Sequence, residues 1–188
     1  MEKGLIIVLC SFFFCFATHA QQTNKNWMQD LNRDLEQFRA CDNVVTAGIN
    51  PCNKFIGSAL STVYKVNDFY SKELGRHLLV SEIASYLKEN QKWSLLGKGF
   101  EQTALVQAQE LANAGKAVVA IYLNQEGIGH VSIILPGELK PSGTWGFQVP
   151  NSASFFISTP DKSYVGKGLS YAFERPLLNG VLLYARNY

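Results

Sequence analysis

Apolar residues recur at helical spacing before Gly115 and in short, strand-like runs after it. The first apolar face is predicted between residues 21 and 40, where four residues follow at intervals of four, four and three: Trp27, Leu31, Leu35 and Phe38. A second helix is predicted to begin at Asn50 and Pro51, because asparagine is a good N-cap and proline fits the first helical position. The residues after Pro51 again mark one apolar face.

Two more helices are predicted, from Ser81 to about Asn90 and from Thr103 to Ala114, the second ending at Gly115. Ser81 is expected to cap the first of these, with Glu82 in its first turn. Five runs rich in β-branched and aromatic residues, separated by Gly, Pro and Ser loops, are predicted as strands: 117–123, 129–135, 145–149, 154–158 and 180–186. Helices followed by strands, without βαβ alternation, predict an α+β domain with helices on a mainly antiparallel sheet.

The first twenty residues have the pattern of a secretory signal peptide. Apolar runs from Leu5 to Leu9 and from Phe12 to Ala17 end in Thr18-His19-Ala20, with small residues where a signal peptidase needs them. A retained membrane anchor is the alternative, but a span needs roughly 20 apolar residues. We therefore expect residues 1–20 to be removed, no stable membrane insertion afterwards, and a periplasmic or extracellular location. Residues 21–188 are then one domain, expected to be monomeric.

Composition narrows the classes of function. The chain has 188 residues, 47% of them hydrophobic, which is enough for a core, and a net charge of only +2 with no cluster of Lys and Arg. This balance provides no electrostatic footprint for nucleic acid. No zinc-ligand spacing, phosphate-binding glycine loop or GxSxG motif occurs. We therefore expect neither a metal nor a cofactor.

Cys52 is the most informative residue in the mature chain. Loss of the signal peptide removes Cys10 and Cys15 and leaves Cys41 as its only disulfide partner. In an oxidising compartment a Cys41–Cys52 disulfide is one interpretation. The other is a nucleophile, because unpaired N–H groups and the helix dipole in the first turn of a helix favour a thiolate.

A histidine and an asparagine are candidate partners for such a nucleophile. His130 is predicted on a strand, where it shares a face with Ser132 and Ile134. Asn151 follows the predicted strand 145–149 and would meet His130 if these strands are antiparallel neighbours; Asp161 and Gln148 are possible substitutes. Each residue also has an ordinary structural interpretation: a core cysteine, a polar residue at a strand edge, and a turn former.

Three segments, in this order, resemble papain-like bacterial cell-wall hydrolases, the NlpC-type endopeptidases and CHAP amidases. "PCNKFIGSAL" resembles their nucleophile helix, "GKAVVAIYLNQEGIGHVSIILPG" is similar to the hairpin that carries their histidine, and "WGFQVPNSASFF" is similar to the strand with the third polar residue. The resemblance implies a papain-like fold. It also implies a catalytic set of Cys52, His130 and Asn151.

The implied activity is hydrolysis of an amide bond in peptidoglycan or a muropeptide, either within the stem peptide or between sugar and peptide. His130 would take the thiol proton, Cys52 would attack the carbonyl carbon and form a thioester, and Asn151 would orient His130. The backbone N–H of Cys52 would help to hold the oxyanion. The alternative is a catalytically inert domain of the same fold that binds wall peptides or a partner protein, with Cys41 and Cys52 in a disulfide. A hydrolase toxin used against competitors is a third hypothesis.

Overall fold

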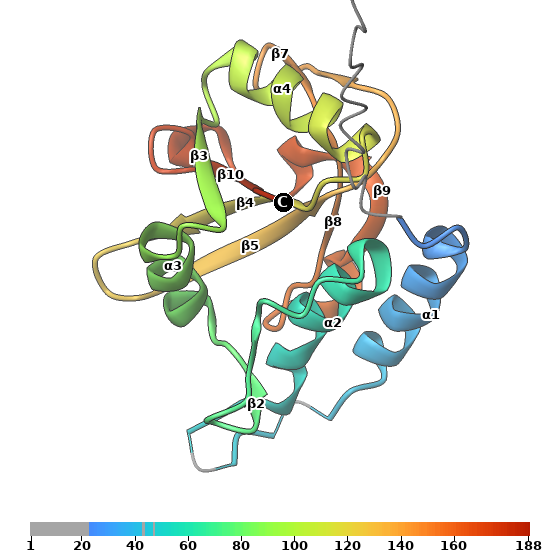
Figure 1. Ribbon diagram of the computed structural model, residues 1–188, viewed down its shortest axis with the longest axis vertical. Helices are drawn as coiled ribbons and strands as arrows, with labels where there is room; N and C mark the ends of the chain where they lie inside the picture. Colours follow the sequence, from blue (N-terminus) through green and yellow to red (C-terminus); the bar gives the residue numbers. More distant parts are fainter. Residues whose placement is uncertain (1–22, 43, 47) are drawn as a thin grey trace, which may run out of the picture.

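A six-stranded antiparallel sheet forms the centre of the molecule, with helices on both of its faces (Figure 1). The computed structural model describes residues 23–42, 44–46 and 48–188, and the predicted signal peptide lies outside these ranges. The strand order is β3-β10-β4-β5-β8-β9. These strands are β3 (Trp93–Lys98), β4 (Val118–Leu123), β5 (Gly129–Ile134), β8 (Asn151–Ser154), β9 (Tyr164–Gly168) and β10 (Leu182–Arg186). The predicted α+β class, with helices packed on a mainly antiparallel sheet, is confirmed.

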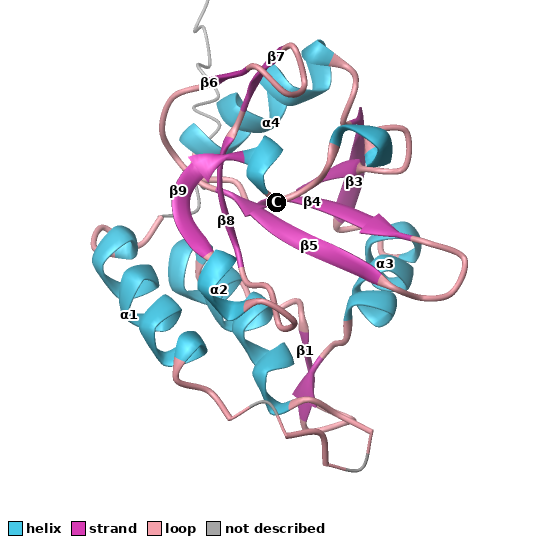
Figure 2. Ribbon diagram, turned by 180° about the vertical axis from the view of Figure 1, so that it is seen from behind, coloured by secondary structure: helices cyan, strands magenta, loops and turns pink. Residues whose placement is uncertain are grey.

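In the described part of the chain, three helices cover one face of this sheet and one helix covers the other (Figures 1 and 2). The first face carries α1 (Trp27–Arg39), α2 (Lys54–Tyr64) and α3 (Val80–Glu89), and the second carries α4 (Gln102–Asn113). Two small hairpins lie outside the central sheet: β1 (Tyr70–Ser71) with β2 (Arg76–His77), and β6 (Lys140–Ser142) with β7 (Phe147–Val149). Short 3-10 turns are η1 (Pro51–Asn53), η2 (Pro160–Lys162), η3 (Leu169–Tyr171) and η4 (Arg175–Leu177).

The alternation of strand residues divides the core into two layers. On β5, Val131 and Ile133 pack with α1, α2 and α3, whereas Ile134 packs with α4. Apolar burial of this kind contributes about 25 cal/mol per Å² removed from water. Because successive strand residues point to opposite faces, the layer that each side chain joins is set by its position in the strand.

The helix predictions agree with the structure more closely than the strand predictions do. Leu31, Leu35 and Phe38 are buried along α1 as expected, and α4 ends before Gly115, whose φ is +79°. The expected cap at Ser81 is wrong: α3 begins one residue earlier, and the Glu82 carboxylate accepts the N–H of Leu79 at 2.7 Å. A carboxylate at the third helical position can satisfy a backbone N–H at the start of a helix in this way.

Two strand predictions are wrong in a way that matters for the site. The strand expected at 154–158 lies earlier, as β8, and Asn151 opens it rather than ending a turn. Moreover, β5 pairs with β8, while β7 pairs with β6 outside the central sheet. The segment from Pro136 to Pro150 therefore leaves the sheet and returns to it, so the strand predicted at 145–149 is not the neighbour of β5 on which the meeting of Asn151 and His130 depended.

Candidate functional site

The sequence predicted Cys52 in the first turn of a helix, and the structure places it in the 3-10 turn η1, directly before α2. The Asn50 side chain caps this turn, with Oδ1 accepting the backbone N–H of Cys52 at 2.8 Å. The Cys52 side chain is buried in the layer formed by α1, α2 and α3. Because the N–H of Cys52 already donates to Asn50, it is not free to hold an oxyanion as the resemblance implied.

The sulfur of Cys52 is bonded to Cys41. This disulfide joins the loop after α1 to the turn before α2, with a sequence separation of 11. A disulfide sulfur is not a thiolate and does not attack a carbonyl carbon. In this structure, therefore, Cys52 has the pairing of the inert alternative and is not a free nucleophile.

His130 faces the other layer of the core. Its ring stacks on Phe156, with centroids 4.4 Å apart and planes 5° from parallel, and meets the edge of Phe173 at 5.6 Å. Phe173 belongs to the layer of α4, whereas Cys52 and Val131 belong to the layer of α2. The strand alternation therefore directs His130 away from Cys52, with the sheet between them.

Aromatic rings dominate the environment of His130. Its Nε2 is buried and makes no hydrogen bond within the described part of the chain. Burial lowers the pKa of the His130 imidazole to about 4, so the ring is neutral at physiological pH. Among the described residues, the rings of Phe156 and Phe173 hold the imidazole, in contrast to a catalytic histidine, which an oriented hydrogen-bond partner normally fixes.

Asn151 lies at the opposite end of β5 from His130. Its carbonyl accepts the N–H of Leu135 at 2.8 Å. Five residues along a strand, from His130 to Leu135, span about 17 Å. The Asn151 amide instead donates to the Pro136 carbonyl at 3.0 Å, and its backbone N–H donates to the side chain of Gln109 at 2.8 Å. Asn151 thus closes the loop that leaves the sheet, and does not orient His130.

The three predicted catalytic residues therefore do not form one site in this structure. Cys52 and His130 lie on opposite faces of the sheet, and His130 and Asn151 at opposite ends of a strand. The two substitutes for Asn151 lie elsewhere: Gln148 on the outer hairpin β6–β7, and Asp161 in the turn η2. The order of the motifs along the chain was compatible with a catalytic triad. The pairing of β5 with β8, and the face of the sheet that His130 occupies, are incompatible with it.

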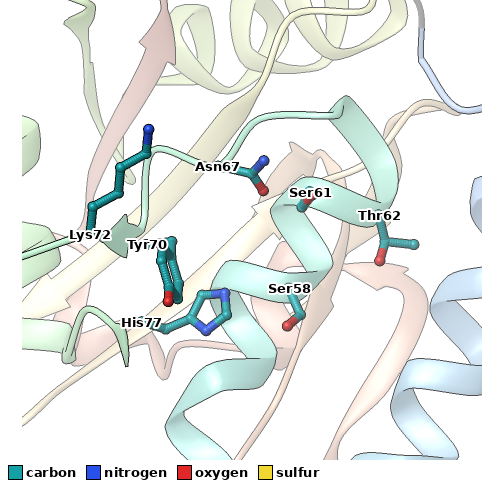
Figure 3. A pocket seen from close by; sticks show the side chains of 7 residues that line it. All are labelled: Ser58, Ser61, Thr62, Asn67, Tyr70, Lys72 and His77. Carbon is teal, nitrogen blue, oxygen red and sulfur yellow. The ribbon is translucent and has the colours of Figure 1, made fainter. Parts of the chain in front are cut away.

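A polar groove runs instead along α2, beside the β1–β2 hairpin. It consists of two adjoining cavities of about 550 Å³ and 270 Å³, and both include Tyr70 and His77. The larger is lined by residues that Figure 3 labels: Ser58, Ser61, Thr62, Asn67, Tyr70, Lys72 and His77. The smaller is lined by Ile49, Asn50, Pro51, Asn53, Lys54, Tyr70, Gly75, Arg76 and His77. We call this surface the α2 groove.

Small residues on α2 bring the hairpin close to the helix. A Cβ on Gly57 would overlap the ring of His77, which explains a glycine inside a helix where it costs about 0.5–1 kcal/mol. Tyr70 is the cross-strand neighbour of His77, and their rings meet edge to face at 5.2 Å. In Figure 3 these two rings lie beside the α2 segment that carries Ser58 and Ser61.

The α2 groove has a positive electrostatic character. Its lining includes Lys54, Lys72 and Arg76 but no Asp or Glu. The Glu82 carboxylate, which is not part of the lining, binds both terminal nitrogens of Arg76 at 2.7 and 2.8 Å, and this holds the pKa of Glu82 at about 2. Among the described residues, neither lysine has a carboxylate within ion-pair distance. Two positive charges are thus available to a ligand.

His77 is the titratable group at the centre of the groove. Burial, and then the positive charge of Lys54, lower the pKa of its imidazole below the usual value of 6.5. Both effects disfavour the imidazolium, so the ring is a neutral hydrogen-bonding group at physiological pH. An anion bound beside His77 would oppose the effect of Lys54 and raise this pKa.

The sequence interpretation missed this groove because its residues form no motif. Lys54, Tyr70, Lys72 and His77 come from a helix and a hairpin whose two-residue strands lie below the length that periodicity detects. One signal was present: Gly57, Ser58 and Ser61 make a small, polar stripe on a helix whose other face is apolar. Such a stripe indicates that another segment packs closely against the helix.

Comparison with known proteins leaves the chain without an assigned family, since no family model and no curated protein matches it. Within the described ranges, no group of three or more His, Cys, Asp or Glu residues is placed to hold a metal ion. A search of the same residues for a helix long and apolar enough to cross a bilayer finds none.

Proposed function

We propose that the protein is an exported, disulfide-bonded domain that binds carboxylate-bearing wall peptides in the α2 groove without cleaving them. The observation that carries this proposal is a groove with two uncompensated lysines and no acidic residue in its lining. The predicted signal peptide supports export. The Cys41–Cys52 pairing supports the inert alternative over the cysteine hydrolase.

The charge of the groove favours an anionic ligand. Lys54 and Lys72 lie in adjoining cavities that meet at Tyr70 and His77, so one extended ligand can reach both ammonium groups. An uncompensated lysine attracts a carboxylate and rejects a cationic ligand. Stem peptides of peptidoglycan carry several carboxylates along a short backbone, which matches two cations spaced along a groove.

The remaining lining groups suit a peptide backbone. Ser58, Ser61 and Asn67 supply hydroxyl and amide groups that both donate and accept hydrogen bonds. Tyr70 is 43% exposed and adds an apolar wall with a polar tip. A rigid disulfide beside the groove limits the ordering cost of binding, because Cys52 precedes the helix that forms one wall.

Hydrolysis of the same substrate is the competing proposal. It requires a reduced Cys52 and a base next to its sulfur, whereas His130 lies across the sheet and Asn151 at the far end of β5. The inert alternative requires neither a free thiol nor a rearrangement. We therefore place the interaction with the wall in the α2 groove and assign Cys52 a stabilising role.

Calorimetric titration of the oxidised protein with a synthetic tripeptide that has two carboxylates and no ammonium group, N-acetyl-L-Ala-γ-D-Glu-L-Ala, tests this function. We expect saturable binding that weakens about fivefold in Lys54→Glu and in Lys72→Glu, in line with the modest energy of exposed ion pairs. The matched control is Lys88→Glu, an exposed lysine on α3 outside the groove. The same tripeptide with amidated carboxylates is expected to bind weakly to all variants.

Equal affinity for the carboxylate and amidated peptides, or an equal effect of Lys88→Glu, would contradict the assignment of the groove. Recovery of a cleaved peptide from the titration cell would favour the hydrolase.

A further inference from the structure

A second cleft lies far from the α2 groove in sequence, between the β6–β7 hairpin and the turn after β9. It has a volume of about 400 Å³ and is lined by Pro141, Ser142, Gly143, Thr144, Ser170 and Tyr171. This is within the range of roughly 300–1,000 Å³ of small-molecule sites. The strands β6 and β9 that lead into its two walls lie against each other (Figure 2). We call this surface the Tyr171 cleft.

One wall of the cleft is an exposed aromatic ring in a fixed position. Tyr171 is 66% exposed, the largest exposure among the large hydrophobic side chains described. Leu169, two residues earlier, is fully buried and anchors the turn, while the ammonium group of Lys167 lies 5.1 Å from the ring centroid of Tyr171. The edge-to-face contact with Tyr164, at 6.1 Å, further orients the ring. Tyr171 thus presents an ordered apolar surface to solvent.

The opposite wall is neutral and rich in hydroxyl and backbone groups. Ser142 Oγ and Thr144 Oγ1 lie 3.2 Å apart, and Ser142 Oγ also accepts the N–H of Trp145. A Cβ on Gly143 would meet nothing within 4 Å, so the backbone there is open to a ligand. None of the six lining residues is charged. The polar groups of the lining are therefore neutral, while the ammonium group of Lys167 beside them is engaged with the Tyr171 ring.

Hydrogen bonds between the segments that carry the two walls hold these walls together. Trp145 is buried, and its indole N–H donates to the carbonyl of Phe173 at 3.0 Å, which joins the hairpin to the segment that carries Tyr171. The N–H of Leu169 donates to the carbonyl of Pro150 at 2.9 Å. These bonds fix the separation of the walls before a ligand arrives, which lowers the entropy cost of binding.

From these contacts we infer that the Tyr171 cleft is a saccharide-binding site. A sugar ring has an apolar face of C–H groups and a rim of neutral hydroxyls. The first matches an ordered, exposed aromatic ring, and the second matches the hydroxyls and open backbone of the opposite wall. The site does not depend on the α2 groove, because the two share no lining residue.

A nitrogen–proton NMR titration of the oxidised protein tests this assignment with two neutral trisaccharides, triacetylchitotriose and maltotriose. We expect saturable shifts of the backbone amides of Gly143, Thr144 and Ser170 with at least one of them, with a dissociation constant in the millimolar range. Tyr171→Ala is expected to weaken binding at least tenfold. Because Tyr171 is largely exposed, this variant keeps its melting temperature within a few degrees.

Phe100→Ala is the matched control, since Phe100 is also exposed and also carries a lysine, Lys98, whose Nζ lies 5.8 Å from the ring centroid. It is expected to leave saccharide binding unchanged. The inference is overturned if neither trisaccharide shifts these amides, or if binding survives Tyr171→Ala. Weaker tripeptide binding in Lys54→Glu with normal saccharide binding would show that the two sites are independent.

Discussion

The two faces of the central sheet differ in the environments that they give to their cysteine and histidine side chains. On the face of α2, Cys52 is buried in a disulfide while His77 opens onto a polar groove. On the face of α4, His130 stacks on Phe156 and lacks a hydrogen bond from Nε2 to any described residue. Motifs in the right order along a chain therefore make a catalytic site only when strand alternation brings them to one face of the sheet.

Removing the disulfide is expected to have the largest effect on the face of α2. A bridge that closes a loop of this length, with a sequence separation of 11, stabilises a fold by about 3 kcal/mol in the chain-entropy model. Cys41→Ser is expected to lower the free energy of unfolding by this amount in urea denaturation monitored by circular dichroism. It leaves Cys52 in place.

The wild type treated with a reducing agent is the control and should reach the same stability. Hydrolysis of sacculi by Cys41→Ser, but not by Cys41→Ser with Cys52→Ala, would contradict the structural role of Cys52.

His130 is expected to make the free energy of unfolding depend on pH. Burial lowers the pKa of His130 from its usual 6.5 to about 4, so the unfolded chain binds more protons than the folded one between these values. Stability should therefore fall as the pH drops from about 6.5 to about 4. The His130→Gln variant should lack this part of the decrease. NMR titration of the imidazole resonances of the folded protein measures the pKa of His130 directly. A value near 6.5 would contradict the buried, stacked environment.

Asn151→Ala is expected to lower the free energy of unfolding, because it disrupts hydrogen bonds on the face of α4. It is expected to leave ligand binding unchanged. Loss of the Asn151 amide leaves the Pro136 carbonyl without this donor, at a cost of about 1–2 kcal/mol. Chemical denaturation measures the change. Gln109→Ala is the companion variant, because Gln109 pairs with the backbone of both Asn151 and Leu135. Unchanged stability in both variants would show that this network is not a structural support.

Protonation of His77 is expected to tune peptide affinity in the α2 groove. Burial and Lys54 lower its pKa, and a bound carboxylate raises it, so binding takes up a proton. Affinity for the tripeptide should rise severalfold, on the order of threefold to tenfold, as the pH falls through the pKa of His77. The measurement is calorimetry at several pH values. His77→Gln should show a flat profile, and a matching pH dependence in that variant would exclude His77 as its source.

The helices were predictable because apolar spacing and capping residues within each segment identify it from the sequence. The intervals between Trp27, Leu31 and Phe38 placed α1, and the Asn50–Pro51 pair placed the turn before α2. The strands β3 and β9 were missed: β3 combines three exposed residues with a glycine, and β9 has two glycines in five residues. Neither has the alternation that identifies a strand from sequence alone.

The site was less predictable, because it depends on contacts between distant segments. The alternation that put His130 with Ser132 and Ile134 was correct, but the sequence did not say which layer of helices this face would meet. Asn151 was assigned by spacing to the wrong end of the strand, since β8 replaced the expected neighbour of β5. The lysines of the α2 groove become neighbours only through the packing of the β1–β2 hairpin on α2.

Co-sedimentation of the oxidised protein with purified peptidoglycan sacculi, followed by mass spectrometry of the supernatant, tests the central proposal most directly. The binding domain proposed here should pellet with the sacculi, release no muropeptide, and show no alkylated cysteine in the native state. Its retention in the pellet should decrease in the Lys54→Glu, Lys72→Glu double variant. Release of muropeptides by the wild type, lost in Cys52→Ala, would contradict the account and establish a hydrolase.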